Sequence, residues 1–225
     1  MKKLTFLKNK KIAHLGVYDN KKIYENSLEA IVKALKKDFI ISLDIKMLKD
    51  GSLVLFSDNT LERLLHVDQK IAKVKRDDLD YISKYKIPTL DEALLVINGR
   101  VPVIINIKCS ARKHGVENYI LNLMKDYPGL FAIQSNNTSQ LKYIHKKNKD
   151  VIIGHVINKK NYYNFIFFHD FDYVCIDALL VSEKQAKKLK EDYFLVGYGV
   201  KTQEQFDKKK NGYDALMCDN ILDIK

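Results

Sequence analysis

Short runs of apolar, often β-branched residues alternate with longer amphipathic stretches along the 225-residue chain. This alternation is typical of β-strands followed by helices, arranged as repeated β/α units around a parallel sheet. A further run, Leu53 to Phe56, follows a Lys-Asp-Gly turn and predicts a hairpin-like addition after the second strand. The eight main strands are predicted at Lys11 to His14, Ile40 to Ile45, Val101 to Lys108, Leu130 to Gln134, Val151 to Val156, Tyr173 to Ile176, Phe194 to Tyr198 and Ala215 to Cys218.

The stretches between these strands repeat apolar residues at helical spacing, and several begin with Ser or Thr in the position of an N-cap. Eight strands with seven or eight helices close into a (β/α)8 TIM barrel, an α/β fold, and no linker or strong repeat divides residues 1–225 into further domains. The predicted helices are Ser27 to Lys37, Thr89 to Asn98, Val116 to Asp126, Ser139 to Lys147, Lys159 to Phe168, Ser182 to Lys190 and Thr202 to Lys210.

In such a barrel the chemistry lies where the strands end, at the carboxyl edge of the sheet. The sequence places polar or reactive side chains there after most strands. These candidates are His14, Ser42, Asp44, Ser57, Asp58, Asn106, Lys108, Gln134, Ser135, His155 and Tyr198.

Composition supports a soluble globular protein, because 46% of residues are hydrophobic and none of the apolar runs approaches the roughly 18 residues of a membrane span. The basic N-terminus has only Leu4 to Leu7 as an apolar run, too short for a signal peptide, so we expect a cytoplasmic protein. Three scattered cysteines, an odd number, indicate reduced thiols rather than disulfides or a metal site.

The net charge of +11 is compatible with an anionic partner, since a positive field concentrates anions. Only Arg63, Arg76, Arg100 and Arg112 among 39 basic residues are arginines, which argues against nucleic acid. A lysine-rich solvated surface is the simpler explanation of the charge, while peripheral contact with an anionic membrane or polymer stays open.

Six sequence segments carry a resemblance to a known family. IAHLG is similar to IAHRG, YENSLEA to PENSLEA, and ISLDIKMLKDGSLVLFSDNTLER to IELDVxxTKDGxxVVFHDxxLxR. IPTLDEALLVINGRVPVIINIK resembles a stretch from IPTLEE to a strand ending in EIK, AIQSN resembles QSF, and GYDALMCDN resembles GVDGIITD. With these motifs in order, the chain is identified as a member of the glycerophosphodiester phosphodiesterase family. The resemblance implies a barrel of the phospholipase C-like phosphodiesterase type and a place in glycerophospholipid metabolism.

The resemblance also implies a mechanism, in which two carboxylates of ELD and one of EIK hold a divalent cation. Two histidines act as acid and base, while an Arg and a Lys meet the phosphate. Carried over by motif, His14 keeps the first histidine, Asp44 a metal carboxylate and Lys108 the phosphate-facing lysine. Glu25 matches the ENS segment as a ligand-binding residue, and Tyr198 stands near the family's Trp as an aromatic floor.

Four of the implied catalytic positions are replaced. Leu15 stands at the Arg, Ser42 and Asn106 at two metal carboxylates, and Ser57 at the second histidine, while Lys201 replaces a further Asn. One carboxylate in place of three should leave at most weak Mg²⁺ or Ca²⁺ binding and no tightly bound cofactor. Serine cannot replace imidazole as a general acid near neutral pH, so we expect metal-assisted hydrolysis to be absent or very slow.

The remaining residues allow different interpretations. His14 is either a remnant acid/base or a polar strand end without a role, and Asp44 and Lys108 form either a ligand site or a buried ion pair. For His155 the simpler interpretation is a surface or packing histidine, and the alternative is that it faces the same mouth and replaces the missing histidine. Three hypotheses follow: an impaired family member that binds a small anionic or phosphorylated ligand, a still-active hydrolase of glycerophosphodiesters, and a lysine-driven adhesion module.

Overall fold

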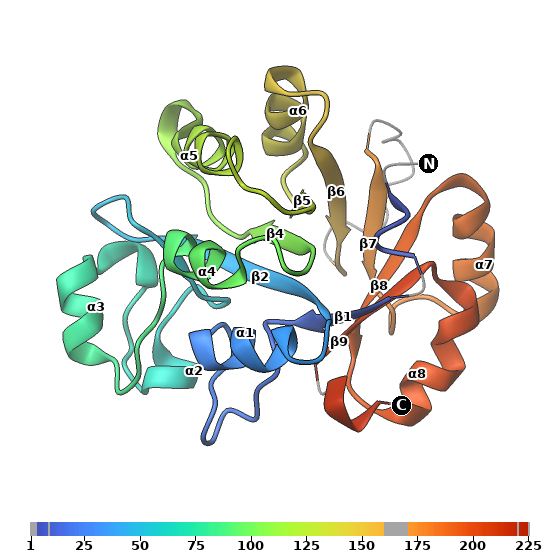
Figure 1. The fold of residues 1–225 in the computed structure, drawn as a ribbon, viewed down its shortest axis with the longest axis horizontal. Helices are drawn as coiled ribbons and strands as arrows, with labels where there is room; N and C mark the ends of the chain where they lie inside the picture. The colour runs from blue at the N-terminus through green and yellow to red at the C-terminus, as the bar shows by residue number, and fades with distance from the viewer. Residues whose placement is uncertain (1–3, 9, 160–170, 220, 225) are drawn as a thin grey trace.

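The protein is described here by a computed structural model, which covers residues 4–8, 10–159, 171–219 and 221–224. Within that part of the chain, eight parallel strands close into a barrel, because β1 pairs with both β2 and β9 (Figure 1). A short strand, β3, pairs antiparallel with β2 outside the barrel. The strands are β1 (Lys11–His14), β2 (Ile40–Met47), β3 (Leu53–Leu55), β4 (Val103–Ile107), β5 (Phe131–Ser135), β6 (Ile152–Ile157), β7 (Tyr173–Asp177), β8 (Leu195–Val200) and β9 (Ala215–Cys218). The predicted (β/α)8 barrel and its added hairpin strand are therefore confirmed.

Helices surround the barrel, and most begin where a Ser, Thr or Asn side chain caps them. Ser27, Thr89, Ser182 and Thr202 each accept a hydrogen bond from a backbone N–H of the first helical turn, as their position in the sequence predicted. The predicted helix Lys159 to Phe168 lies almost wholly outside the described residues. The described α-helices are α1 (Leu28–Leu35), α2 (Glu62–Leu65), α3 (Arg76–Ile82), α4 (Leu90–Ile97), α5 (Gly115–Met124), α6 (Thr138–Lys147), α7 (Glu183–Asp192) and α8 (Gln203–Lys209). Short 3₁₀ turns lie at Ile71–Lys73, Arg112–His114, Lys210–Gly212 and Ile221–Asp223.

Alternation along each strand sorts the side chains into two layers. Outward residues such as Ile41, Ile105 and Ile153 pack against the helices, whereas inward residues such as Ile12 and Ile104 fill the barrel. Tyr173 fills much of the interior, because Gly154 beside it has no side chain: a Cβ there would lie 2.1 Å from the Tyr173 ring. The hydrophobic interior therefore closes the lower barrel, and polar inward residues begin only near the carboxyl ends of the strands.

The segment between β3 and α4 forms a small core of its own beside the barrel (Figure 1). Phe56, Leu61, Ile71 and Leu79 are buried there between β3, α2 and α3. The sequence analysis predicted neither helix. This segment matters for function because Ser57, Asp58 and Asn59 lie at its start, directly beside the barrel mouth.

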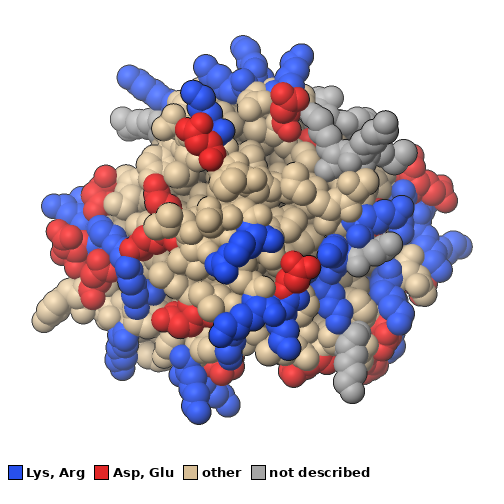
Figure 2. All heavy atoms as spheres, viewed as in Figure 1, with Lys and Arg blue, Asp and Glu red and all other residues tan. Residues whose placement is uncertain are grey.

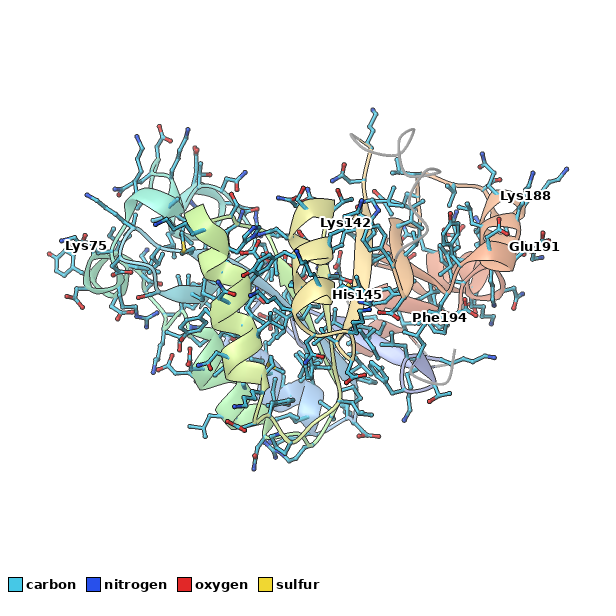
Figure 3. The ribbon with its side chains drawn as sticks, turned by 90° about the horizontal axis from the view of Figure 1, so that it is seen from above. Lys75, Lys142, His145, Lys188, Glu191 and Phe194 are labelled. Atoms are coloured by element: carbon cyan, nitrogen blue, oxygen red, sulfur yellow. The ribbon has the colours of Figure 1, made fainter. Side chains whose placement is uncertain are left out.

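Lysine and arginine side chains project around the visible face, with aspartate and glutamate between them (Figure 2). Charged residues such as Lys75, Lys188 and Glu191 point away from the barrel (Figure 3). Within the lysine-rich C-terminal helices, Lys208 pairs with Glu204 at 2.6 Å and Lys210 with Asp207 at 2.7 Å. These contacts agree with the solvated-surface interpretation of the charge. Across the described residues, every helix is too short or too polar to cross a membrane.

Candidate functional site

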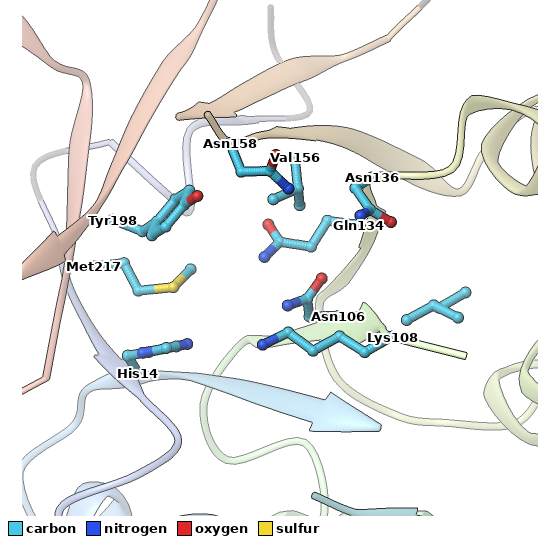
Figure 4. Close-up of a pocket in the computed structure, with 10 residues that line it drawn as sticks. His14, Asn106, Lys108, Gln134, Asn136, Val156, Asn158, Tyr198 and Met217 are labelled. Atoms are coloured by element: carbon cyan, nitrogen blue, oxygen red, sulfur yellow. The ribbon is translucent and has the colours of Figure 1, made fainter. Parts of the chain in front are cut away.

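A cavity of about 160 Å³ opens at the carboxyl ends of the barrel strands (Figure 4). Of the predicted candidates, the structure brings His14, Asn106, Lys108, Gln134 and Tyr198 together around it. The His14 ring and the Lys108 ammonium end point toward one another. The full lining is His14 from β1, Asn106, Ile107 and Lys108 at the end of β4, Gln134 and Asn136 at the end of β5, Val156 and Asn158 at the end of β6, Tyr198 from β8 and Met217 from β9. Apart from Ile107, Val156, Met217 and the ring of Tyr198, this lining is polar.

Asp44 is buried under the cavity and is held by two residues of its lining. Its Oδ2 lies 2.5 Å from Lys108 Nζ, and its Oδ1 accepts a hydrogen bond from Asn106 Nδ2 at 2.6 Å. The backbone N–H of Asp44 donates to Asn26 Oδ1 at 3.3 Å. The strand register explains this cluster. Asp44 of β2 pairs with Asn106 of β4, and Lys108, two residues after Asn106, is the next residue to face the same side.

The ionised form of Asp44 is stabilised by this arrangement. Burial raises the pKa of the Asp44 carboxyl, but the positive charges of Lys108 and His14 and the hydrogen bonds from Lys108 and Asn106 outweigh it, so the pKa lies below its usual value. The carboxylate is fully buried and Lys108 is 37% exposed, so the ammonium group has one side on Asp44 and another toward the cavity. Lys108 can therefore contact a bound anion without leaving Asp44.

The residues around Asp44 do not fit a divalent cation, which the family implies at this place. Mg²⁺ and Ca²⁺ take several oxygen ligands, with carboxylates providing most of the charge. Here Asp44 is already neutralised by Lys108, Asn106 presents an N–H rather than its oxygen, and Ser42 offers a neutral hydroxyl. Among the described residues, no group of three or more His, Cys, Asp or Glu side chains is arranged to hold a metal. The polar groups at this place therefore favour a site in which the ammonium group of Lys108, and not a metal ion, neutralises Asp44.

His14 pairs with a residue that the sequence analysis did not single out. His14 Nδ1 lies 2.6 Å from Asp219 Oδ1, and Lys201 Nζ lies 3.9 Å from the other oxygen of this carboxylate. A carboxylate can only accept, so Nδ1 carries the proton and the ring turns its Nε2 edge away from Asp219. This pairing fixes the ring orientation of His14 in the cavity wall and leaves Nε2 for a ligand, as a donor when the ring is protonated and as an acceptor when it is neutral.

Glu25 lies outside the lining of the cavity, contrary to its predicted place in ligand binding. Arg63 binds the Glu25 carboxylate with both Nη atoms, at 2.5 and 2.9 Å, and Asn20 Nδ2 donates to it at 2.9 Å. Arg63 also donates from Nε to Asp58 Oδ2 at 2.6 Å. Since Glu25 is 5% exposed and its oxygens are engaged, this motif residue ties the loop after β1 to the loop after β3 instead of facing a ligand.

The replaced positions are also accounted for structurally. Leu15 is buried, with φ at +61°, and its backbone N–H donates to Ser42 O, so no cation extends from this loop to the cavity. Gly16 next to it has φ at +85° and packs on α1, where a Cβ would lie 2.8 Å from the Ala30 carbonyl carbon. Ser57 accepts a hydrogen bond from Asn26 Nδ2 at 3.2 Å. Leu15, Gly16 and Ser57 therefore take part in the local structure of the loops beside the cavity.

Of the two interpretations of His155, the structure supports packing and not replacement of the missing histidine. His155 points to the helix side of β6, where its ring lies 5.0 Å from that of Phe171, and it does not line the cavity. Its neighbour Val156 takes the inward position, because adjacent residues of a strand face opposite sides. Burial lowers the pKa of His155 to about 4, so its ring is neutral at pH 7. Tyr198, in contrast, does line the cavity, and its hydroxyl donates to Ile157 O at 3.2 Å.

Comparison with known proteins identifies the family of the chain. The sequence profile of the Glycerophosphoryl diester phosphodiesterase family matches residues 14–222. The chain belongs to this family. A glycerophosphodiester phosphodiesterase of Caldanaerobacter subterraneus subsp. tengcongensis is 29% identical over 159 residues, a match that covers 64% of this chain and 64% of the relative. The match thus spans somewhat less than two thirds of the length of that family member.

Solved structures of the phosphodiesterase family share the fold. The glycerophosphodiester phosphodiesterase of Thermotoga maritima superposes with a TM-score of 0.76 at 22% identity, over 94% of each chain. An Oleispira antarctica phosphodiesterase in complex with the product sn-glycerol-3-phosphate gives a TM-score of 0.78 at 19% identity, over 95% of this chain and 94% of that one. At these identities the comparison supports the closed barrel and leaves the chemistry to the residues of this chain.

The sequence predicted Asn106 and Gln134 at the mouth, but three residues of the site were missed: Asp219, Asn136 and Asn158. Asp219 directly follows β9, in the place where the last strand of a barrel ends, and that position was a usable signal. Asn136 and Asn158 likewise come directly after strand ends. The strand-end rule applied to every strand would have found all three residues.

Proposed function

We propose that this protein is a catalytically impaired member of the glycerophosphodiester phosphodiesterase family that binds an anionic, phosphorylated ligand at the barrel mouth. The observation that carries the proposal is the position of Lys108, whose ammonium group neutralises Asp44 at 2.5 Å and also lines the cavity opposite His14. Lys201, 63% exposed beside Asp219, adds a second ammonium group near the mouth. A phosphate oxygen between Lys108 and His14 would accept charge-assisted hydrogen bonds from both, provided that His14 is protonated.

Catalytic impairment follows from the groups that surround this ligand position. Cleavage of a phosphodiester requires stabilisation of charge on the phosphate and protonation of a poor leaving group. Here Ser57 replaces the imidazole that would protonate the leaving group, and loss of such a general acid typically costs roughly 10² to 10⁴ in rate. Leu15 adds no charge, and the remaining carboxylate is neutralised by Lys108. Binding therefore needs only groups that are present, whereas hydrolysis needs groups that are absent from these positions.

A second candidate function is residual hydrolysis of glycerophosphodiesters to glycerol 3-phosphate and an alcohol. The contact of His14 with Asp219 favours it, because a carboxylate behind an imidazole orients the ring and stabilises its protonated form during proton transfer. One acid/base group of this kind would support slow turnover. An effect of His14→Ala on turnover separates this activity from background hydrolysis.

Calorimetric titration with inorganic phosphate and with glycerol 3-phosphate, in the presence of EDTA, tests the binding proposal. We expect saturable binding that weakens by roughly 10-fold or more in His14→Gln, since a charge-assisted hydrogen bond contributes about 1.5 to 3 kcal/mol. The exposed Lys75, the N-cap residue of α3, provides a control, because it does not line the cavity and Lys75→Met removes one positive charge. Equal weakening in both variants would mean that net charge, not the cavity, attracts phosphate.

A further inference from the structure

A second groove, of about 450 Å³, adjoins the cavity and shares three of its lining residues, Ile107, Lys108 and Asn136. It runs from the end of β4 between the segment after β3 and the start of α6. Its other lining residues are Lys46, Ser57, Asp58, Asn59, Cys109, Ser110, Asn137 and Gln140. Lys108 therefore stands at the junction of the two spaces, and a ligand whose phosphate contacts Lys108 in the cavity can extend into the groove.

The groove is lined mainly by hydroxyl and amide groups. Its charged residues are engaged with protein partners: Lys46 Nζ donates to Asn59 Oδ1 at 2.5 Å and to Lys108 O at 2.7 Å. Asp58 accepts from Arg63 Nε at 2.6 Å. Ile107 and Cys109 are the apolar members of the described lining, and it includes no aromatic ring. This surface matches neither an acyl chain nor an aromatic group, because their burial would leave the polar groups without partners.

Three groups of the groove are placed to bind hydroxyls. Ser57 Oγ accepts from Asn26 Nδ2 at 3.2 Å, so its own hydroxyl proton remains to be donated. Ser110 is exposed in the loop after β4, and Asn136, exposed after β5, offers both an amide donor and an acceptor where the groove meets the cavity. Ligand hydroxyls both donate and accept, which is the combination that these side chains require.

From this lining we infer that the groove is a subsite for a polyhydroxylated group, of the size of a sugar or hexitol, esterified to the phosphate that Lys108 binds. The inference rests on the proposed function and narrows its ligand to polyol or sugar phosphates larger than glycerol phosphate. It also gives Ser57 a role: the residue at the former histidine position recognises a hydroxyl instead of protonating a leaving group.

Calorimetry with three phosphate monoesters tests this subsite: glycerol 3-phosphate, sorbitol 6-phosphate and octyl phosphate. We expect sorbitol 6-phosphate to bind about tenfold more tightly than glycerol 3-phosphate, because it reaches the groove, and octyl phosphate to show no such gain. Ser110→Tyr should fill the groove and abolish the gain without changing the affinity for glycerol 3-phosphate. Ser110→Ala, which adds no bulk but removes a hydroxyl, should remove part of the gain in affinity for sorbitol 6-phosphate.

Asn122→Tyr serves as the matched control, since Asn122 lines a separate groove beside α5. Equal affinities for the two polyol phosphates, or a gain that survives Ser110→Tyr, would overturn the subsite and leave the phosphate site standing. If glycerol 3-phosphate itself fails to bind the wild-type protein, the proposed function and the subsite both fall.

Discussion

Replacing Lys108 by Met removes the ammonium group 2.5 Å from Asp44 and keeps a side chain of similar length. The Asp44 carboxylate is fully buried, so it would lose its charged partner where water does not reach it. Removing one partner of a buried ion pair typically costs about 3 to 5 kcal/mol. Because Lys108 is 37% exposed and Asn106 still donates to the carboxylate, we expect a smaller loss in unfolding free energy, about 2 to 3 kcal/mol.

Urea denaturation followed by circular dichroism measures this loss, and a thermal melt should show a midpoint lower by roughly 4 to 12 °C. Lys75→Met is again the control, because Lys75 is exposed and we expect its replacement to change stability by less than about 0.5 kcal/mol. The double variant Asp44→Asn/Lys108→Met removes both charges, so it should be more stable than Lys108→Met alone.

The loss in unfolding free energy caused by Lys108→Met should also depend on pH, in a direction that the pKa of Asp44 determines. In the wild type the pKa of Asp44 lies below its usual value, although burial raises it, because Lys108 and His14 stabilise the carboxylate. The stability from the pair is therefore present above the ordinary pKa of an aspartate and lost as the pH falls through the depressed one. Without Lys108, burial is less opposed and the pKa of Asp44 rises. The loss in unfolding free energy caused by Lys108→Met should then be smaller at pH 5 than at pH 7. A loss below about 1 kcal/mol, or one independent of pH, would refute the stabilising ion pair between Asp44 and Lys108.

Three other predictions test the loops around the mouth and the barrel wall. Gly16→Ala should cost about 2 to 4 kcal/mol because of its φ of +85° and the contact with Ala30, whereas Gly51→Ala, with a φ of +92° and nothing within 4 Å, should cost about 1 kcal/mol in the same urea assay. Arg63→Met should destabilise the fold by about 2 kcal/mol, because the buried Glu25 loses its bidentate partner; an unchanged denaturation midpoint would contradict this role. The pKa of His155 is lowered to about 4 by burial, so stability should fall as the pH drops from about 6.5 toward 4, and in His155→Leu a pH series should show a shallower fall.

The barrel was predictable because its strands are bounded runs of buried β-branched residues, and β1 and β9 begin and end where the sequence placed them. The helices α2 and α3 were missed because they have four and seven residues and bury only Leu65 and Leu79, too few for a helical period to show. Their stability comes from the small core formed within residues 48–87, whose contacts are not visible as a helical period in the sequence.

The motifs place His14 and Lys108 at strand ends, and both residues line the cavity in the structure. The facing of a side chain depends on its exact place in the strand: His155 directly precedes the inward-facing Val156 and therefore faces the helices. For Glu25 the local pattern does not indicate the partner, because Arg63 lies 38 residues away along the chain. Long-range pairs such as His14 with Asp219 become visible only when the barrel closes.

One measurement tests the central claim most directly: binding of glycerol 3-phosphate and hydrolysis of a glycerophosphodiester, each followed in one preparation with EDTA, Mg²⁺ or Ca²⁺. The account predicts the same dissociation constant under all three conditions and a turnover at least about 100-fold below the roughly 1 s⁻¹ of a slow ordinary enzyme. Hydrolysis at about 1 s⁻¹ or faster that requires the metal, or binding that appears only when the metal is added, would contradict it.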